Sequence, residues 1–363
     1  MRIQFEKRTD RNRLSGFLIP VLSFFLAILF SALILLFFDI NPIQAYSVMV
    51  KGSLGSTYAL SETLVKAIPL MLTGLGVSIA FHMHFWNIGA EGQLAMGGIA
   101  AAYVALFLKD AIPSSLLLPA MFLAGGLAGA VWGLIPAGLK SSIGVNEILT
   151  TLMMNYIATL LVEYLYLGPW RDPKGFGFPG TAQFVQAAWL PRLTGRVHYG
   201  IFFALAAAVL LWFLLSRTKR GYEIRLIGEN PKAARYAGIN ITKNIILVML
   251  ISGGLSGLAG MAEVSGIAHR LYMGLTVGYG YTAIIIAWLA NLNPWAILVV
   301  AFLMGALLVG GDQLQIAMQT PAAVASILQG AILFFMLGGS IFNTYKITIT
   351  RTRSKKQGEN AHE

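Results

Sequence analysis

The feature that most constrains this chain is a series of apolar runs, each long enough to cross a lipid bilayer. The clearest run is residues 17–38, which holds 22 residues and no charged side chain. A helix rises 1.5 Å per residue, so this run covers about 33 Å, the hydrocarbon thickness of a bilayer. Because similar runs recur along the sequence, we predict an all-α polytopic membrane protein rather than a soluble enzyme.

Composition and charge support this class. Hydrophobic residues make up 57% of the chain and charged residues 11%, and the mean hydropathy is +0.72, whereas a soluble domain carries about 25% charged residues. The net charge of +11 fits the enrichment of Lys and Arg on the cytoplasmic side of membrane proteins. The sequence lacks a basic patch interleaved with aromatic residues, the pattern that would indicate nucleic-acid binding. The absence of cysteine excludes disulfides and thiolate metal sites.

Hydropathy predicts about ten transmembrane helices. Two of the segments, 90–108 and 275–290, are short, glycine-rich and begin in polar sequence, which fits either a full span or a re-entrant segment. The ten predicted segments are 17–38, 60–82, 90–108, 115–139, 147–167, 200–216, 244–267, 275–290, 294–310 and 320–338.

The distribution of basic residues predicts that both termini are cytoplasmic. With the N-terminus inside, 18 of the 26 Lys and Arg residues fall on the cytoplasmic side, as the positive-inside rule requires. We therefore expect one membrane domain over 17–338, with cytoplasmic tails at 1–16 and 339–363. Its two long connections are an extracytoplasmic loop, 168–199, and a basic cytoplasmic loop, 217–243.

The cytoplasmic loop has the pattern of two short structured elements. In the second element Asn230 suits an N-cap, Pro231 the first helical turn and Gly238 the C-cap. A short capped helix can act as a rigid lever for a partner. The alternative is a solvated loop that is held inside by its charge alone.

Small residues recur at four-residue spacing on two predicted spans and indicate close helix packing. Gly125, Gly129 and Gly133 lie on one face of the first span, and Ser252, Ser256 and Gly260 on one face of the second. The similar stretches 125–129 and 253–257 lie on spans of opposite direction, which suggests an inverted internal repeat.

Two polar stretches at membrane depth, 85–93 and 145–156, are the candidates for a solute passage. Intramembrane polar groups are costly unless they are paired or face a cavity, so they either line a passage or join helices by hydrogen bonds. The candidate passage residues are Trp86, Asn87, Glu91, Gln93, Asn146, Glu147, Thr151, Asn155 and Tyr156.

The sequence offers no catalytic, cofactor or metal site. His82 and His84 are two residues apart, so they do not share a helix face, and no third ligand has suitable spacing. His198 and His269 are isolated, and we expect them to be solvated or capped in loops. No nucleophile elbow or Walker A sequence occurs, so a nucleotide that drives this protein would bind to another chain.

Several of these stretches together resemble a known family. Residues 228–239, 87–93 and 145–156, followed by 278–280, 310–313 and Pro321, are similar to the motifs of ABC-importer permease subunits. The branch is the one that handles simple sugars, branched-chain amino acids and nucleosides, and the chain looks most like the nucleoside permeases.

The resemblance implies a transport subunit of the bacterial or archaeal plasma membrane that is not itself an enzyme. Its partners would be a separate ABC ATPase, a second related permease in a heterodimer and an extracytoplasmic or lipid-anchored substrate-binding protein. The alternative is an ion- or proton-coupled secondary transporter, for which Glu91, Glu147 and Glu263 are available. The residues expected to couple to the ATPase are Gly228, Glu229, Asn230, Pro231, Ala233, Ala234, Arg235, Gly238 and Ile239.

Overall fold

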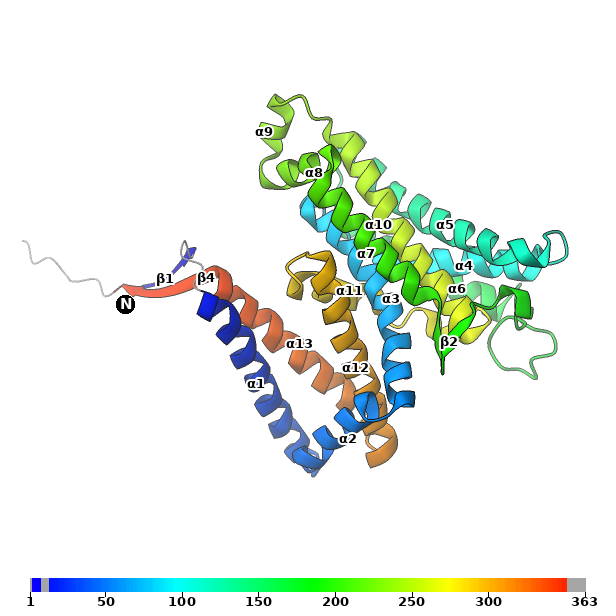
Figure 1. Cartoon of the computed structure of the whole chain (residues 1–363), viewed down its shortest axis with the longest axis horizontal. Coiled ribbons are helices and arrows are strands. Elements are labelled where there is room, and N and C mark those ends of the chain that lie inside the picture. Colours follow the sequence, from blue (N-terminus) through cyan, green and yellow to red (C-terminus); the bar gives the residue numbers. More distant parts are fainter. Residues whose placement is uncertain (1, 8–12, 351–363) are drawn as a thin grey trace, which may run out of the picture. The chain divides into compact units, whose positions relative to one another are not determined.

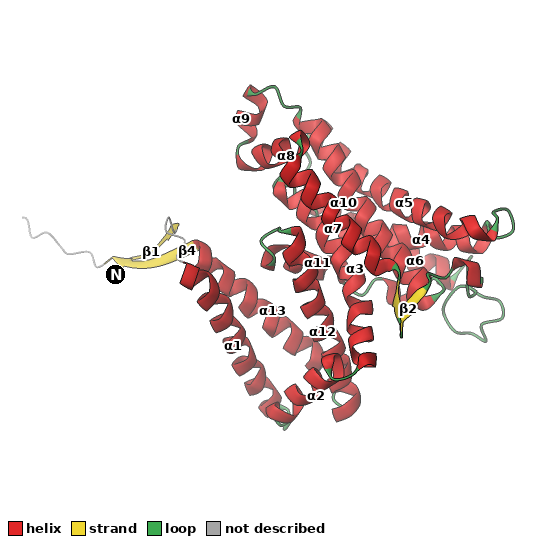
Figure 2. Cartoon of the chain, in the orientation of Figure 1, coloured by secondary structure: helices red, strands yellow, loops and turns green. Residues whose placement is uncertain are grey.

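The computed structural model describes residues 2–7 and 13–350, and it divides the chain into two compact units. One unit combines Met1–Pro42 with Ser326–Glu363, and the other is Ile43–Ala325. The described elements are predominantly helices (Figures 1 and 2), as the predicted all-α class requires, with two short antiparallel strand pairs in addition.

The smaller unit is formed by the two ends of the chain. Helix α1 (Arg13–Phe37) and most of α13 (Ala322–Thr344) belong to it, with Phe30 and Phe335 rings 5.3 Å apart. Strands β1 (Arg2–Lys7) and β4 (Tyr345–Thr350) pair antiparallel. Both strands alternate apolar and polar residues, a two-residue period typical of strands. The regions predicted as tails, 1–16 and 339–363, therefore include this strand pair as well as the ends of α1 and α13.

The larger unit holds the remaining long helices and the polar sites. The helices are α2 (Pro42–Leu54), α3 (Thr57–His82), α4 (Ala90–Phe107), α5 (Ser114–Ile143), α6 (Glu147–Leu167), α7 (Gly200–Arg217), α8 (Lys219–Glu229), α9 (Pro231–Tyr236), α10 (Ile241–Glu263), α11 (Tyr279–Leu289) and α12 (Pro294–Met318). The short elements are η1 (Gln186–Ala188), β2 (Arg192–Thr194), β3 (Val197–His198), η2 (Val264–Ala268) and η3 (Met273–Leu275).

Eight described helices are long and apolar enough to cross a membrane, or nine with the broken pair Leu22–Phe37 and Pro42–Leu54. The segment predicted at 275–290 belongs to a shorter apolar stretch, Met273–Leu289. The interruption lies at Gly278, which adopts a φ of 92° just before α11 begins. Each of the ten predicted segments coincides with a helix, and the span count of ten stays a prediction.

Helix α10 packs closely against α3, α4 and α5, and small residues on two of its faces allow this. A Cβ atom on Gly129 would overlap the Gly253 carbonyl of α10, and one on Gly260 would overlap the Leu94 carbonyl of α4. On α3, a Cβ atom on Gly76 would lie 2.7 Å from the Ser252 carbonyl oxygen. The predicted close-packing faces are confirmed. The similar stretches 125–129 and 253–257 pack against each other, and the inverted repeat stays a prediction.

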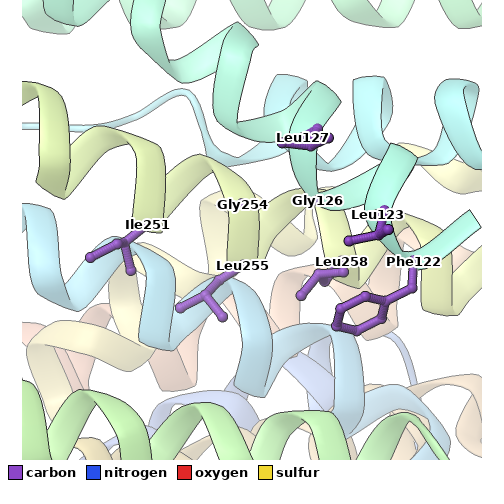
Figure 3. A pocket seen from close by; sticks show the side chains of 8 residues that line it. All are labelled: Phe122, Leu123, Gly126, Leu127, Ile251, Gly254, Leu255 and Leu258. Carbon is purple, nitrogen blue, oxygen red and sulfur yellow. The ribbon is translucent and has the colours of Figure 1, made fainter. Parts of the chain in front are cut away.

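A shallow apolar groove lies between α5 and α10 next to this contact (Figure 3). Gly126 and Gly254 lie in it, where an added Cβ atom would meet ordinary contacts of 3.4 Å or longer. These two glycines are therefore not required for the approach of the two helices. The groove is lined by Phe122, Leu123, Gly126, Leu127, Ile251, Gly254, Leu255 and Leu258.

Candidate functional site

The centre of the polar cluster is Asn87, in the irregular connection between α3 and α4. Its Nδ2 donates to Ser252 Oγ on α10 at 2.9 Å and to Gln93 Oε1 on α4 at 3.1 Å. Its Oδ1 accepts from the backbone N–H of Gly89 at 2.9 Å, just before α4 begins. One fully buried amide thus joins the start of α4 to α10.

Helix α6 contributes the second part of the cluster through side chains one turn apart. Asn155 Oδ1 accepts from the backbone N–H of Gly92 at 2.8 Å, and its Nδ2 donates to the Ile88 carbonyl at 2.8 Å. Thr151 Oγ1 accepts from the Ile88 backbone N–H at 3.3 Å. The predicted polar stripe on α6 therefore satisfies backbone groups at the start of α4.

Glu91 connects the start of α4 to the start of α11. Its Oε1 accepts from the Gly278 backbone N–H at 2.8 Å, and its Oε2 accepts from that of Gly280 at 2.6 Å. The first N–H groups of a helix have no partner within the helix and carry partial positive charge, so a carboxylate is well placed there. Glu91 is the N-terminal anchor of α11.

These polar side chains are buried within this chain. Asn87 is 0% exposed and Glu91 3%, and Gln93, Thr151 and Asn155 are also buried. The chain by itself therefore forms the interhelical hydrogen-bond cluster that the sequence allowed as one alternative. A passage-lining role for these residues stays a prediction.

The other candidates lie outside this cluster. Asn146 caps α6 by accepting from the Ile148 backbone N–H at 2.9 Å, and Glu147 pairs with Lys140 Nζ at 2.7 Å. Trp86 stacks on Trp288 of α11, with ring centroids 5.7 Å apart. Tyr156, on α6, is 57% exposed.

Sequence reasoning missed Lys66, a charged residue inside α3. Its Nζ lies 5.9 Å from the centre of the buried Tyr279 ring, a cation–π geometry. Glu263, at the end of α10, is buried next to the π-helical turn η2, a kind of irregularity often found at functional sites. A lysine within the apolar segment 60–82 is itself the signal that could have identified Lys66.

The basic loop after α7 forms two helices, as predicted. Asn230 Oδ1 accepts from the backbone N–H groups of Lys232 and Ala233 at 3.1 and 3.0 Å. Pro231 is in the first turn of α9, and Gly238 follows the helix with a φ of 75°. The local structure of this loop therefore follows the capping rules.

Helix α8 holds this loop against the ends of three long helices. Gly228 lies against the His82 carbonyl of α3, and Arg225 Nη1 donates to the Leu215 carbonyl of α7. Asn244 of α10 donates from Nδ2 to Glu223 Oε2 at 3.0 Å. This hydrogen bond from Asn244, with Arg220 beside it, holds the pKa of Glu223 below its usual value. A displacement of α8 would act directly on α3, α7 and α10.

Helix α9 projects from this support (Figure 1). Ala234 is buried against it, whereas Tyr236 is 92% exposed. Lys232 and Arg235 are exposed too. The predicted coupling residues therefore separate into a supporting group that includes Gly228 and Ala234, and an exposed group that includes Arg235.

The connection after α6 is held by backbone hydrogen bonds to η2 and to the residue that follows it. Phe184 N–H donates to the His269 carbonyl at 2.7 Å, and Leu190 N–H to the Ser265 carbonyl at 3.1 Å. The solvated alternative for the histidines is wrong: His198 is fully buried with its ring against Gly266 of η2, and Trp189 stacks on the buried His269, with ring centroids 3.9 Å apart. The capped alternative holds for His269, which follows η2 and has Nδ1 2.9 Å from the Ser265 carbonyl oxygen. Burial, with His269 and Arg192 nearby, lowers the pKa of His198 to about 4. Within the described ranges no three His, Asp or Glu side chains meet as a metal site.

Comparison with known proteins gives consistent matches. Residues 59–337 match the family described as branched-chain amino acid transport system / permease component. The glucose ABC transporter permease protein TsgB13 of Haloferax volcanii is 36% identical, over 92% of this chain and 90% of that protein. Two proteins of Bacillus subtilis also match. The guanosine ABC transporter permease protein NupP is 33% identical over 96% of this chain and 99% of that protein. The guanosine ABC transporter permease protein NupQ is 32% identical over 61% of this chain and 72% of that protein.

Proposed function

Since this chain belongs to the family of branched-chain amino acid transport system permease components, we propose that it forms half of the passage of an ATP-driven importer. The solute is a nucleoside or a related sugar-containing molecule, and ATP is hydrolysed by a separate ABC ATPase. The family match and the eight apolar helices among the described residues support a multi-pass membrane protein.

The observation that best supports the coupling role is the way α9 is attached to α8 and exposed to solvent. The helix is capped at both ends, presents Arg235 and Tyr236 to solvent, and is continuous with α8 through Asn230. Helix α8 contacts the ends of α3, α7 and α10. Rigid packed elements transmit displacement. An ATPase bound to α9 would therefore displace α3, α7 and α10 together through α8.

The solute assignment draws on the relatives and on the polar residues near the centre of the unit. One relative is named for guanosine and one for glucose, and both solutes are neutral and rich in hydrogen-bonding groups. In this proposal the passage residues come from the connection before α4, from α4 itself and from α6, and selectivity depends mainly on a substrate-binding protein that delivers the solute. The similarity to both NupP and NupQ supports a second, related permease as the other half.

The coupling role predicts that substitutions on the exposed face of α9 weaken binding of the ATPase. The double variant Arg235→Glu, Tyr236→Asp should retain less than about a tenth of the ATPase on copurification and should lose ATP-dependent uptake, because it reverses charge at the contact. These side chains are better targets than Ala234, whose burial would make an aspartate disrupt α9 itself. Copurification and uptake in proteoliposomes with internal ATP are the measurements.

The matched control is Phe176→Asp, because Phe176 is 98% exposed and lies in the 168–199 loop. It should keep both the ATPase and transport. Undiminished copurification of the α9 variant would contradict the docking role. Uptake that continues without ATP and stops with a protonophore would instead favour the secondary transporter.

The proposed topology places loop 168–199 outside the plasma membrane and loop 217–243 in the cytoplasm. The chain has no cysteine, so an introduced cysteine is the single thiol in the chain that a maleimide can label. In intact cells Phe176→Cys should react with a membrane-impermeant maleimide, and Thr242→Cys should react only after the cells are permeabilised. Equal labelling of both positions before permeabilisation would refute this topology.

A further inference from the structure

Helix α11 presents an aromatic face that the other helices of the larger unit leave uncovered. Tyr281 is 39% exposed and Trp288 is 42% exposed. They are seven residues apart, which is two helical turns, so they lie on the same face. The opposite face, with Ala283, Ile286 and Ala287, is buried. No residue of α11 carries a charge, so this face suits a neutral molecule.

At the start of α11 this face continues onto α6. Asn155 Nδ2 donates to the Tyr281 hydroxyl at 3.2 Å. The next residue on α6, Tyr156, is exposed and lies near the middle of Glu147–Leu167. Tyrosines in membrane proteins concentrate at the bilayer interface, and a hydroxyl in hydrocarbon is costly without a partner. The exposed phenol of Tyr156 near the middle of α6, next to the Asn155–Tyr281 hydrogen bond, therefore indicates a polar passage rather than lipid.

At the other end of α11 the face continues onto the connection before α4. Trp288 stacks on Trp86 with an interplanar angle of 22°, and Phe81 packs on Trp86 with ring centroids 5.1 Å apart. Trp86 directly precedes Asn87, the centre of the hydrogen-bond cluster. The nearby end of α3, at His82, is also in contact with Gly228 of α8. Exposed aromatic rings thus lie at both ends of this face of α11.

We propose that Tyr156, Tyr281 and Trp288, with Trp86 packed behind Trp288, form a stacking track for the flat base of a purine nucleoside. The inference rests on the proposed import function and specifies the solute and where it moves. Aromatic stacking accepts any base, and successive weak contacts allow a solute to move on. The two tyrosine hydroxyls offer partners for the ribose hydroxyls.

The test uses the assembled importer, with its partner permease and ATPase, in proteoliposomes supplied with radiolabelled guanosine and with radiolabelled glucose. The double variant Tyr281→Leu, Trp288→Leu should lower the kcat/KM of guanosine import at least tenfold. The variant Tyr281→Phe, Trp288→Phe should stay within about threefold of wild type, since it keeps rings at both positions. Photoactivated 8-azidoguanosine should label Tyr156, Tyr281 or Trp288.

The control is Tyr164→Leu, because Tyr164 is 64% exposed on the same helix as Tyr156 but near its end. It should leave guanosine import unchanged, and all variants should retain the ATPase. Wild-type guanosine kinetics in the leucine double variant would overturn the track and leave the importer intact. ATP-driven import of glucose but not guanosine by the wild type would also overturn the track. Absence of any ATP-dependent import would count against the proposed function itself.

Discussion

The variant Gly253→Val should be strongly destabilised, whereas Gly254→Val should keep nearly the stability of the wild type. A side chain at Gly253 would meet backbone, because its Cβ atom would overlap the Gly129 carbonyl and lie 3.1 Å from Ala130 Cα. Forcing two helix backbones apart costs about 3 kcal/mol, the upper part of the usual range for overpacking, in a protein whose helices depend on close contact. The measurements are thermal unfolding and the monodisperse fraction on size exclusion in detergent.

Gly254, the next residue, provides a matched control for the Gly253 variant. Gly254 faces the apolar groove between α5 and α10 (Figure 3), where the nearest atom to an added Cβ, the Gly126 carbonyl oxygen, would be 3.6 Å away. The same residue type is thus replaced by the same side chain one position apart. Equal melting temperatures for the two variants would contradict the assigned α5–α10 packing.

Local signals in the sequence were sufficient wherever the structure depends on neighbouring residues. The helix α9 begins at Pro231 after an Asn230 cap, and Gly238 follows it in the left-handed conformation. Each of these features is determined by residues within a turn or two. The long apolar helices were predictable for a similar reason, since hydropathy needs no knowledge of the partners.

Partners distant in the sequence were not predictable in this way. Glu91 binds backbone N–H groups 187 and 189 residues away, and Asn155 binds a backbone N–H 63 residues before it. The sequence indicated that these polar groups needed partners or a cavity, but only the helix arrangement identifies which partners. The burial of His198 likewise depends on a loop that folds back onto η2.

The same distinction explains the interruption of the segment predicted at 275–290. Glycines at 278 and 280 allow a break, but glycine alone does not require one. The break is stabilised by a carboxylate from α4, which replaces the missing intrahelical acceptors at the start of α11. A half-length helix that begins inside the protein is a feature of transporter passages, and here it carries the aromatic face assigned to the solute.

Removal of the Glu91 carboxylate should therefore detach the start of α11 and destabilise the protein strongly. In Glu91→Ala two N–H groups, of Gly278 and Gly280, lose their acceptor, at about 1–3 kcal/mol for each buried donor. Glu91→Gln should be intermediate, because its amide offers one acceptor oxygen but directs an N–H donor towards the second N–H. Melting temperature should fall in the order wild type, Gln variant, Ala variant, and hydrogen exchange at 278–282 should accelerate in the same order.

Transport measurements on these variants separate anchoring from a direct role in the passage. Glu163→Ala is the control, since Glu163 is an exposed carboxylate on α6 and should leave both melting and uptake unchanged. If Glu91 acts through α11, guanosine uptake should fall in parallel with the protection of 278–282 from exchange. If uptake falls in Glu91→Gln while exchange there stays as slow as in wild type, the carboxylate has a separate role in the passage. Wild-type melting and exchange in Glu91→Ala would refute the anchor, because two buried N–H groups would then have lost their acceptor without consequence.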